Sequence, residues 1–172
     1  NKWRKLNYNF KALKASSANG ILTFGGAYSN HLAAAAALAA QEQIPIVGIV
    51  RGEELAHKPL NPTLSQCQAN GMHLVFVTRA EYKLKEYGEK VCQLVAAKNL
   101  LIIPEGGTNE LAVKGCAEIL TTDDMRFDVI GCAVGTGGTL SGLATSAAAH
   151  QKVVGFQMVD DATIPDRIRT FV

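Results

Sequence analysis

The sequence predicts an α/β protein in which parallel open sheets carry helices on both faces. Short apolar segments alternate with helical segments along the whole chain. These apolar segments lack the polar alternation of a half-exposed strand, as is typical of parallel strands covered by helices on both sides. Three of them end in glycine-rich turns, at 25–30, 105–108 and 135–139. Because ligands bind at the carboxyl ends of parallel strands, these turns are the first places to look for a site.

The helices are predicted from the 3.6-residue spacing of apolar side chains and from capping residues. They cover residues 2–14, 31–42, about 62–70, 80–98, about 109–121 and about 138–149, with a final helix starting at Pro165. The strands are the short apolar runs at 21–24, 44–50, 72–77, 100–103, 127–134 and 153–158. Ser29 or Asn30 is expected to cap the second helix. The helix over 80–98 is expected to bury the apolar stripe Leu84, Tyr87, Val91, Leu94 and Val95.

Composition narrows the class of protein. The chain has 172 residues, 48% of them hydrophobic and 19% charged, which is typical of a soluble protein of one domain or two small lobes. No apolar run approaches the ~18 residues of a membrane span, and no signal peptide is visible. The net charge of +2 is dispersed, so no nucleic-acid partner is expected. The four cysteines form no CxxC pair, which favours reduced, buried thiols in a cytoplasmic protein over a zinc or other metal site.

The turn at 135–139 is the clearest candidate for ligand binding. Its glycines allow the backbone to approach a ligand closely, and the first-turn amides of the following helix are unpaired. The helix dipole adds partial positive charge, and Thr136 and Thr139 add hydroxyls, so a phosphate is the expected ligand. The turn lacks the Gly-Lys-Ser/Thr ending of a P-loop and fits the dinucleotide pattern poorly. A tight turn without a ligand is the alternative.

The turn after the first strand, at 25–31, combines two glycines with Tyr28, Ser29, Asn30 and His31 at a helix start. Exposed amides there would bind a carboxylate. Capping alone would explain one of the polar residues but not all of them together. Lys2, taken by itself, is more typical of a solvated surface charge.

Four segments together resemble a known family. They are 1–6 (Asn-Lys-Trp-Arg-Lys-Leu), 23–31 (Thr-Phe-Gly-Gly-Ala-Tyr-Ser-Asn-His), 104–109 (Pro-Glu-Gly-Gly-Thr-Asn) and 135–139 (Gly-Thr-Gly-Gly-Thr). In this order and spacing they resemble the D-cysteine desulfhydrase and 1-aminocyclopropane-1-carboxylate deaminase family. Those proteins are pyridoxal-phosphate enzymes of the tryptophan-synthase-β fold type.

The resemblance implies a role for each site residue. Lys2 matches the lysine that carries pyridoxal 5'-phosphate covalently and acts in catalysis, a role that requires a lowered pKa. Asn30 matches the residue that hydrogen-bonds the cofactor ring hydroxyl, and Ser29 matches a catalytic serine near the substrate. The segment Ser29, Asn30 and His31 matches the substrate-carboxylate binder. Gly135, Thr136, Gly137, Gly138 and Thr139 match the phosphate-binding loop.

The implied activity is β-elimination from a small amino acid such as D-cysteine, giving pyruvate, ammonia and sulfide. 1-Aminocyclopropane-1-carboxylate deamination, a non-catalytic phosphate-binding fragment and a nucleotide-binding domain remain alternatives. The resemblance also implies a homodimer with two lobes, a large one from 1–24 and 122–172 and a small one from 25–121. Family members are longer at both ends, so we expect the C-terminal part of the large lobe, with residues that close the substrate pocket, to be missing.

Overall fold

The computed structural model describes all 172 residues, which form two compact units. The two-stranded unit comprises Asn1–Phe10 and Gly106–Val172, and the four-stranded unit comprises Lys11–Glu105. The first helix, α1 (Lys2–Lys14), belongs to both and has the predicted length. The lobes expected from the sequence have other boundaries, after residues 24 and 121, and their assignment stays a prediction.

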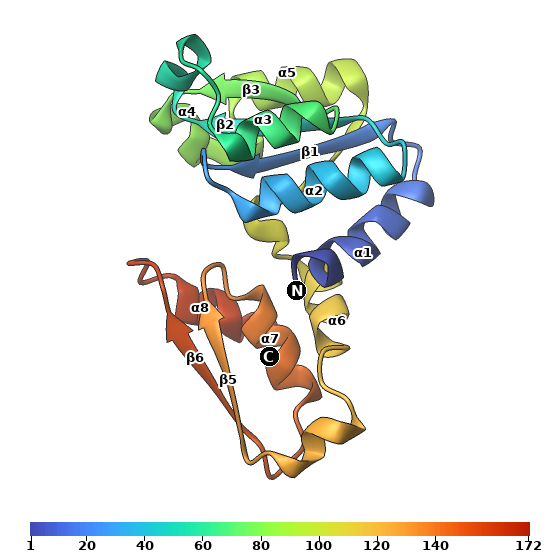
Figure 1. The fold of residues 1–172 in the computed structure, drawn as a ribbon, viewed down its shortest axis with the longest axis vertical. Helices are drawn as coiled ribbons and strands as arrows, with labels where there is room; N and C mark the ends of the chain where they lie inside the picture. The colour runs from blue at the N-terminus through green and yellow to red at the C-terminus, as the bar shows by residue number, and fades with distance from the viewer. The chain divides into compact units, whose positions relative to one another are not determined.

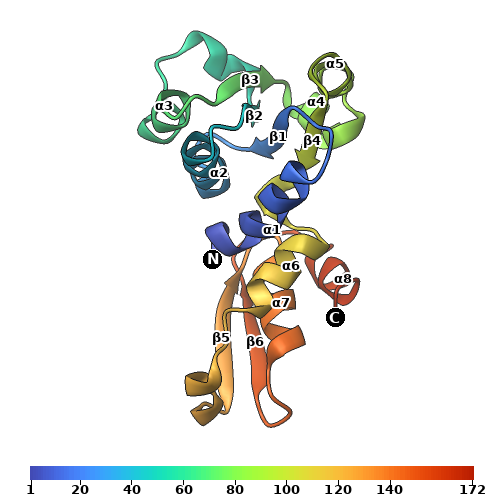
Figure 2. The ribbon, with the colours of Figure 1, turned by 90° about the vertical axis from the view of Figure 1, so that its right-hand side faces the viewer.

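The four-stranded unit contains a parallel sheet in the order β3-β2-β1-β4. Its strands are β1 (Gly20–Gly25), β2 (Ile46–Arg51), β3 (His73–Val77) and β4 (Leu100–Ile103). Ile21 at the centre pairs with Ile46 on one side and Leu101 on the other. Helices α2 (Asn30–Gln41) and α3 (Pro62–Ala69) cover one face of this sheet, and α4 (Arg79–Leu84) and α5 (Glu89–Lys98) cover the other (Figure 2). The predicted fold class is therefore confirmed.

The core of this unit forms around the central strand, because all six residues of β1 are buried. The buried cluster consists of Leu22, Phe24, Val47, Ile49, Val77, Tyr82, Val91 and Leu100. A short 3₁₀ turn, η1 (Glu53–His57), follows β2. This arrangement brings the carboxyl ends of β1, β2 and β3 to one edge of the sheet, since all the strands are parallel.

The single helix predicted over 80–98 is wrong. It divides into α4, the 3₁₀ turn η2 (Lys85–Tyr87) and α5. The break lies at Lys85, whose φ of 52° is incompatible with a continuing right-handed helix. Of the predicted apolar stripe, Leu84 and Tyr87 are consequently exposed, whereas Val91 is buried.

The two-stranded unit contains the parallel strands β5 (Val129–Val134) and β6 (Lys152–Gln157), joined through α7 (Gly138–Ser146) (Figure 1). Helix α6 (Glu110–Ala117) packs against α7, and α8 (Ile164–Arg169) ends the chain. The helices predicted over 109–121 and 138–149 both end earlier than expected. A capping box at Thr121 starts a separate 3₁₀ turn, η4 (Thr122–Arg126), after α6.

One side of the β5–β6 sheet exposes apolar side chains, among them Val129, Phe156 and Met158. All four cysteines are free thiols, but Cys92 is exposed, against the expectation of buried thiols. None of the helices has the length and apolar character needed to cross a membrane.

Candidate functional site

The turn at 135–139 links the end of β5 at Val134 to the start of α7 at Gly138, as the sequence predicts. Gly137 caps the helix with a φ of 90°, in the left-handed region that glycine adopts without strain. The first-turn N–H groups of α7 have no intrahelical acceptor. These N–H groups and the positive end of the helix dipole point out of the N-terminus of α7. Such an arrangement favours the binding of an anion.

Two glycines of this turn are needed for different reasons. A Cβ atom at Gly137 would lie 2.7 Å from Ile168, so the protein itself requires a glycine there. A Cβ atom at Gly135 would meet no protein atom within 4 Å. The space beside Gly135 is thus left open toward a cavity, where a ligand could approach the backbone closely.

That cavity has a volume of about 120 Å³ and lies within the two-stranded unit. Its lining includes two lysines from the start of α1, Lys2 and Lys5. Residues three apart lie on the same face of a helix, so both amines point to the same side of α1. The remaining lining residues are Asn1, Ala133, Val134, Gly135, Thr136, Gly137, Thr139 and Leu140.

Lys5 is the most unusual group in this cavity because its side chain is only 3% exposed. Its ammonium donates hydrogen bonds to Thr108 Oγ1 at 3.2 Å and Thr136 Oγ1 at 3.4 Å. A third bond reaches the Gly106 carbonyl at 3.4 Å. None of these acceptors carries a charge, whereas buried charges in proteins are usually paired. A bound anion would supply the missing countercharge.

Burial, reinforced by the neighbouring charge of Lys2, lowers the pKa of Lys5 to about 8. Burial also lowers the pKa of Lys2, although the Cys116 thiol opposes this shift. Lys2 is half-buried, and no hydrogen bond or ion pair of the structure engages its amine. An amine with a lowered pKa is neutral in a larger fraction of molecules, and only the neutral form is a nucleophile or a base.

The third glycine-rich turn, at 105–108, does not line this cavity but is hydrogen-bonded to the turn at 135–139, which does. Thr108 Oγ1 lies 2.5 Å from Thr136 Oγ1, which joins the two turns by a hydrogen bond. Gly106 has a φ of 68°, and a Cβ atom there would lie 2.7 Å from Thr136. The glycine therefore allows the two turns to meet around the Lys5 ammonium.

The lowered pKa of Lys5 predicts how anion binding depends on pH. We expect sulfate, whose own charge is constant in this range, to bind more weakly as the pH rises through about 8, where Lys5 loses its proton. Between about pH 7 and about pH 9.5 the affinity should fall by roughly tenfold, because the ammonium becomes a neutral amine. Calorimetric titration with sulfate at both pH values measures this change. A Lys5→Met variant should bind sulfate weakly at both, and equal sulfate affinity of the unmodified protein at both would refute the assignment.

The remaining predicted residues lie in the four-stranded unit, at the start of α2. Ser29 caps this helix by accepting a hydrogen bond from the Leu32 amide at 3.2 Å, and Asn30 is exposed. The His31 ring is buried, with Nε2 2.7 Å from Thr23 Oγ1. Because the Thr23 hydroxyl donates to the Ile103 carbonyl at 2.8 Å, it accepts the proton of His31 Nε2. Nε2 of the His31 ring is thus already engaged within the protein.

The structure brings together Lys2 and the 135–139 loop, whereas Ser29, Asn30 and His31 form a second group in the other unit. Within the loop, Gly138 is buried and does not line the cavity. The roles of all these residues stay predictions. Lys5 and Thr108 were missed by the sequence reasoning. Lys5 could have been found from the sequence, because it lies three residues after Lys2 and therefore on the same face of the helix.

The chain matches the sequence model of the family described as "Pyridoxal-phosphate dependent enzyme" over residues 1–171. It is 33% identical over 167 residues to a Thermotoga maritima protein provisionally named a 1-aminocyclopropane-1-carboxylate deaminase, with 90% of this chain and 52% of that one covered. It is 29% identical to the Arabidopsis thaliana protein named "Bifunctional D-cysteine desulfhydrase/1-aminocyclopropane-1-carboxylate deaminase, mitochondrial", with 100% of this chain and 47% of that one covered. The chain spans about half the length of the curated relatives it matches.

Solved structures agree on the fold. The crystal structure of an ACC deaminase homologue superposes with a TM-score of 0.82 at 23% identity, covering 99% of this chain and 55% of that one. Maize serine racemase superposes with a TM-score of 0.71 at 18% identity, covering 90% of this chain and 46% of that one.

Proposed function

Because the chain belongs to the family of pyridoxal-phosphate dependent enzymes, we propose that it is part of a lyase that acts on a small amino acid. The main reaction is D-cysteine desulfhydration, giving pyruvate, ammonia and sulfide, and the alternative is 1-aminocyclopropane-1-carboxylate deamination. One observation carries the proposal: two lysines with lowered pKa values line the cavity formed by the glycine turn at 135–139. The Arabidopsis relative, whose name includes both activities, supports both reactions alike.

The residues present fit the phosphate end of the cofactor. A cavity of about 120 Å³ is far smaller than the ~300 Å³ or more of a site for a whole small molecule, and it suits an anionic group alone. Lys5 would supply the countercharge, Thr136 and Thr139 the hydroxyls, and the start of α7 the amides. The open space at Gly135 lets the phosphate reach the backbone.

Lys2 would hold the cofactor covalently through its amine, and the lowered pKa favours the neutral form that this bond requires. When bound, pyridoxal phosphate takes up the negative charge that develops at Cα of an amino acid. Lys2 would then accept the proton that leaves Cα at its Nζ atom. Its position on the cavity rim, without competing hydrogen bonds, leaves the amine available for both tasks.

The start of α2 would bind the substrate carboxylate. Ser29 and the first amides of this 12-residue helix, from Asn30 and His31, supply hydrogen-bond donors at its positive end. The buried bond between His31 and Thr23 fixes the first turn of α2 against β1. The hydroxyl of Ser29 and the amide group of Asn30 are the side chains assigned to the substrate and to the cofactor ring hydroxyl.

Turnover by the full-length protein tests the proposal. After saturation with pyridoxal phosphate, we expect a visible absorption band from covalently bound cofactor and release of sulfide and pyruvate from D-cysteine. Ammonia released from 1-aminocyclopropane-1-carboxylate without sulfide from D-cysteine would favour the alternative reaction. L-Cysteine serves as the stereochemical control.

Two other outcomes would contradict the proposal. A visible band without turnover of either substrate would favour a non-catalytic pyridoxal-phosphate-binding protein. Stabilisation by nucleotides, without any visible band, would favour a nucleotide-binding domain.

We also propose that the protein is a cytoplasmic homodimer. The resemblance to the desulfhydrase and deaminase family supports the dimer, and the four free thiols support a reducing compartment. The Arabidopsis relative carries "mitochondrial" in its name, and recovery of the full-length protein in the mitochondrial fraction of its cell would refute the cytoplasmic location. Sedimentation of the full-length protein tests the oligomeric state, and a monomer would refute it.

A further inference from the structure

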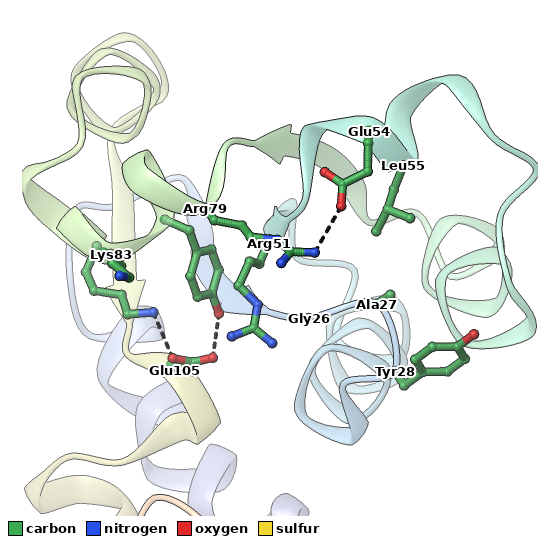
Figure 3. Close-up of a pocket in the computed structure, with 11 residues that line it drawn as sticks. Gly26, Ala27, Tyr28, Arg51, Glu54, Leu55, Arg79, Lys83 and Glu105 are labelled. Carbon is green, nitrogen blue, oxygen red and sulfur yellow. Dashed lines mark hydrogen bonds and ion pairs between the residues drawn. The ribbon is translucent and has the colours of Figure 1, made fainter. Parts of the chain in front are cut away.

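A second, larger cavity lies wholly within the four-stranded unit, at the carboxyl ends of its central strands (Figure 3). Its volume is about 680 Å³, within the ~300–1,000 Å³ range of small-molecule sites. The turn Gly26–Tyr28 after β1 forms one side, and Arg51 at the end of β2 lies between this turn and Glu105. Parallel sheets bind ligands at this edge, and the only lining residues that the sequence singled out are those in the glycine-rich turns at 25–30 and 105–108.

The cavity carries an excess of positive charge. Four cations line it (Arg51, Arg79, Lys83 and Lys85) against two carboxylates (Glu54 and Glu105). Both carboxylates are already engaged: Glu54 pairs with Arg79 at 3.4 Å, and Glu105 pairs with Lys85 at 2.8 Å. Arg51 and Lys83 have no ion pair or hydrogen bond within the protein. The cavity therefore has an excess of two positive charges and offers a ligand two cations that have no direct ion pair.

Arg51 is an exposed residue at the end of β2, and its hydrogen-bond donors are not used within the protein. Its guanidinium lies 5.8 Å from the centroid of the Tyr82 ring. On the other side, a Cβ atom at Gly26 would lie 3.7 Å from Arg51 Nη2, so the guanidinium reaches the backbone of the turn. A guanidinium that lies at cation–π distance from a ring keeps its planar set of donors free for a carboxylate or phosphate. Arg51 is thus oriented for an anion.

The group beneath Arg51 is rigid and internally satisfied. Tyr82 donates to Glu105 at 2.5 Å, and the Lys85 ammonium lies 3.5 Å from the Tyr82 ring centroid. Burial alone would raise the pKa of Glu105, but the hydrogen bonds from Lys85 and Tyr82 and the charges of Lys85 and Arg51 lower it overall. The residue that carries this ammonium, Lys85, has a strained backbone with a φ of 52°. Glu105 is therefore neutralised by Lys85, and Arg51 remains available.

We propose that this cavity binds the anionic side-chain group of a further class of amino-acid substrate, with Arg51 as its main ligand. The inference rests on the proposed function, which assigns the α-carboxylate to Ser29–His31. Gly26–Tyr28, which lines the cavity, immediately precedes that segment in the same turn. Two anion sites joined by one short turn can bind a molecule with two anionic groups. The inference therefore adds a further substrate class to the two proposed reactions: an amino acid with a carboxylate or phosphate on its side chain, in either configuration at Cα.

Binding of isosteric amino acids to the full-length, cofactor-loaded protein tests this inference. Aspartate and asparagine have the same size and differ in the charge of the side chain, so calorimetric titration with the D and L forms of each isolates that charge. We expect aspartate of one configuration to bind at least about tenfold more tightly than the matching asparagine, the factor that a charge-assisted hydrogen bond supplies. Comparing O-phosphoserine with serine in the same way shows whether phosphate is preferred to carboxylate.

Substitution of Arg51 tests whether this cavity, rather than another part of the protein, causes the preference for the anionic amino acid. Arg51→Met should abolish the preference for the anionic member of each pair while leaving the visible cofactor band intact. Arg126→Met is the matched control, because Arg126 also makes a cation–π contact, at 4.8 Å from the Phe127 centroid, and lines no part of this cavity. It should retain the preference.

Three results would overturn the inference. Equal binding of aspartate and asparagine, or a preference that survives Arg51→Met, would exclude the assigned role of Arg51. Binding of inorganic phosphate that depends on Arg51, with no effect on amino-acid preference, would show an anion site unrelated to the substrate. In each case an intact cofactor band leaves the proposed function standing, whereas absence of the band from the unmodified protein would overturn both.

Discussion

Replacement of Lys2 by alanine is expected to abolish covalent cofactor binding and to lower turnover by about 10³-fold or more, the upper range for loss of an acid–base group. Lys2 lies on the rim of the small cavity, with an amine that burial shifts toward its neutral form. Alanine has no nitrogen with which to hold the cofactor or to accept a proton from Cα. The visible absorption band and the rate of sulfide release from D-cysteine measure the two effects.

Lys5→Ala is the matched control, since it removes an amine from the same face of α1 and the same cavity. We expect this variant to retain a visible band at high cofactor concentration but to need more cofactor, because the phosphate loses a charged hydrogen-bond donor. Loss of the band in Lys5→Ala together with its retention in Lys2→Ala would reverse the two assignments.

Gly115→Ala is expected to lower the free energy of unfolding by about 3 kcal/mol, near the upper end of the usual cost of overpacking. In an unobstructed helix the same change would gain about 1 kcal/mol. Here the new Cβ atom would lie 2.0 Å from the Arg4 carbonyl oxygen, a backbone atom that cannot rotate away. Helices α1 and α6 would have to separate. Urea denaturation of the cofactor-free protein measures the loss.

The same substitution should disturb the site, because Arg4 lies between the two lysines on α1. A shift of α1 would move Lys5 away from Thr108 and Thr136 and weaken sulfate binding. Gly131→Ala is the control: it adds a methyl group in the same unit, where the nearest atom is the edge of the Phe156 ring at 3.4 Å. If Gly115→Ala is as stable as Gly131→Ala, the close approach of α1 and α6 is incorrect.

Local sequence pattern was sufficient for the fold class and for the strand–turn–helix at 135–139. Buried parallel strands such as β1 are apolar throughout, and the polar group that caps α2 is the predicted Ser29. The apolar spacing gave a wrong prediction where a single backbone angle ended a helix. Nothing in the apolar spacing of 80–98 reveals that Lys85 adopts a positive φ, because that conformation is maintained by contacts with Tyr82 and Glu105.

The site was predictable only in part for a related reason. The sequence indicates that Lys2 and the glycine turn matter, the former only through the resemblance to a family. The burial of Lys5 depends on Thr108 and Thr136, which lie more than a hundred residues away along the chain. The Arg51 cavity likewise depends on Tyr82 and Glu105, which come from other elements. Such groups become visible only when the fold brings them together.

The identity of the lysine that binds the cofactor is the central claim. Reduction of the cofactor-loaded protein with borohydride, followed by proteolysis and mass spectrometry, fixes the cofactor to the amine that holds it. We expect the added mass on Lys2, with Lys5 unmodified. Attachment of the cofactor to Lys5, or to any lysine outside the small cavity, would contradict the account.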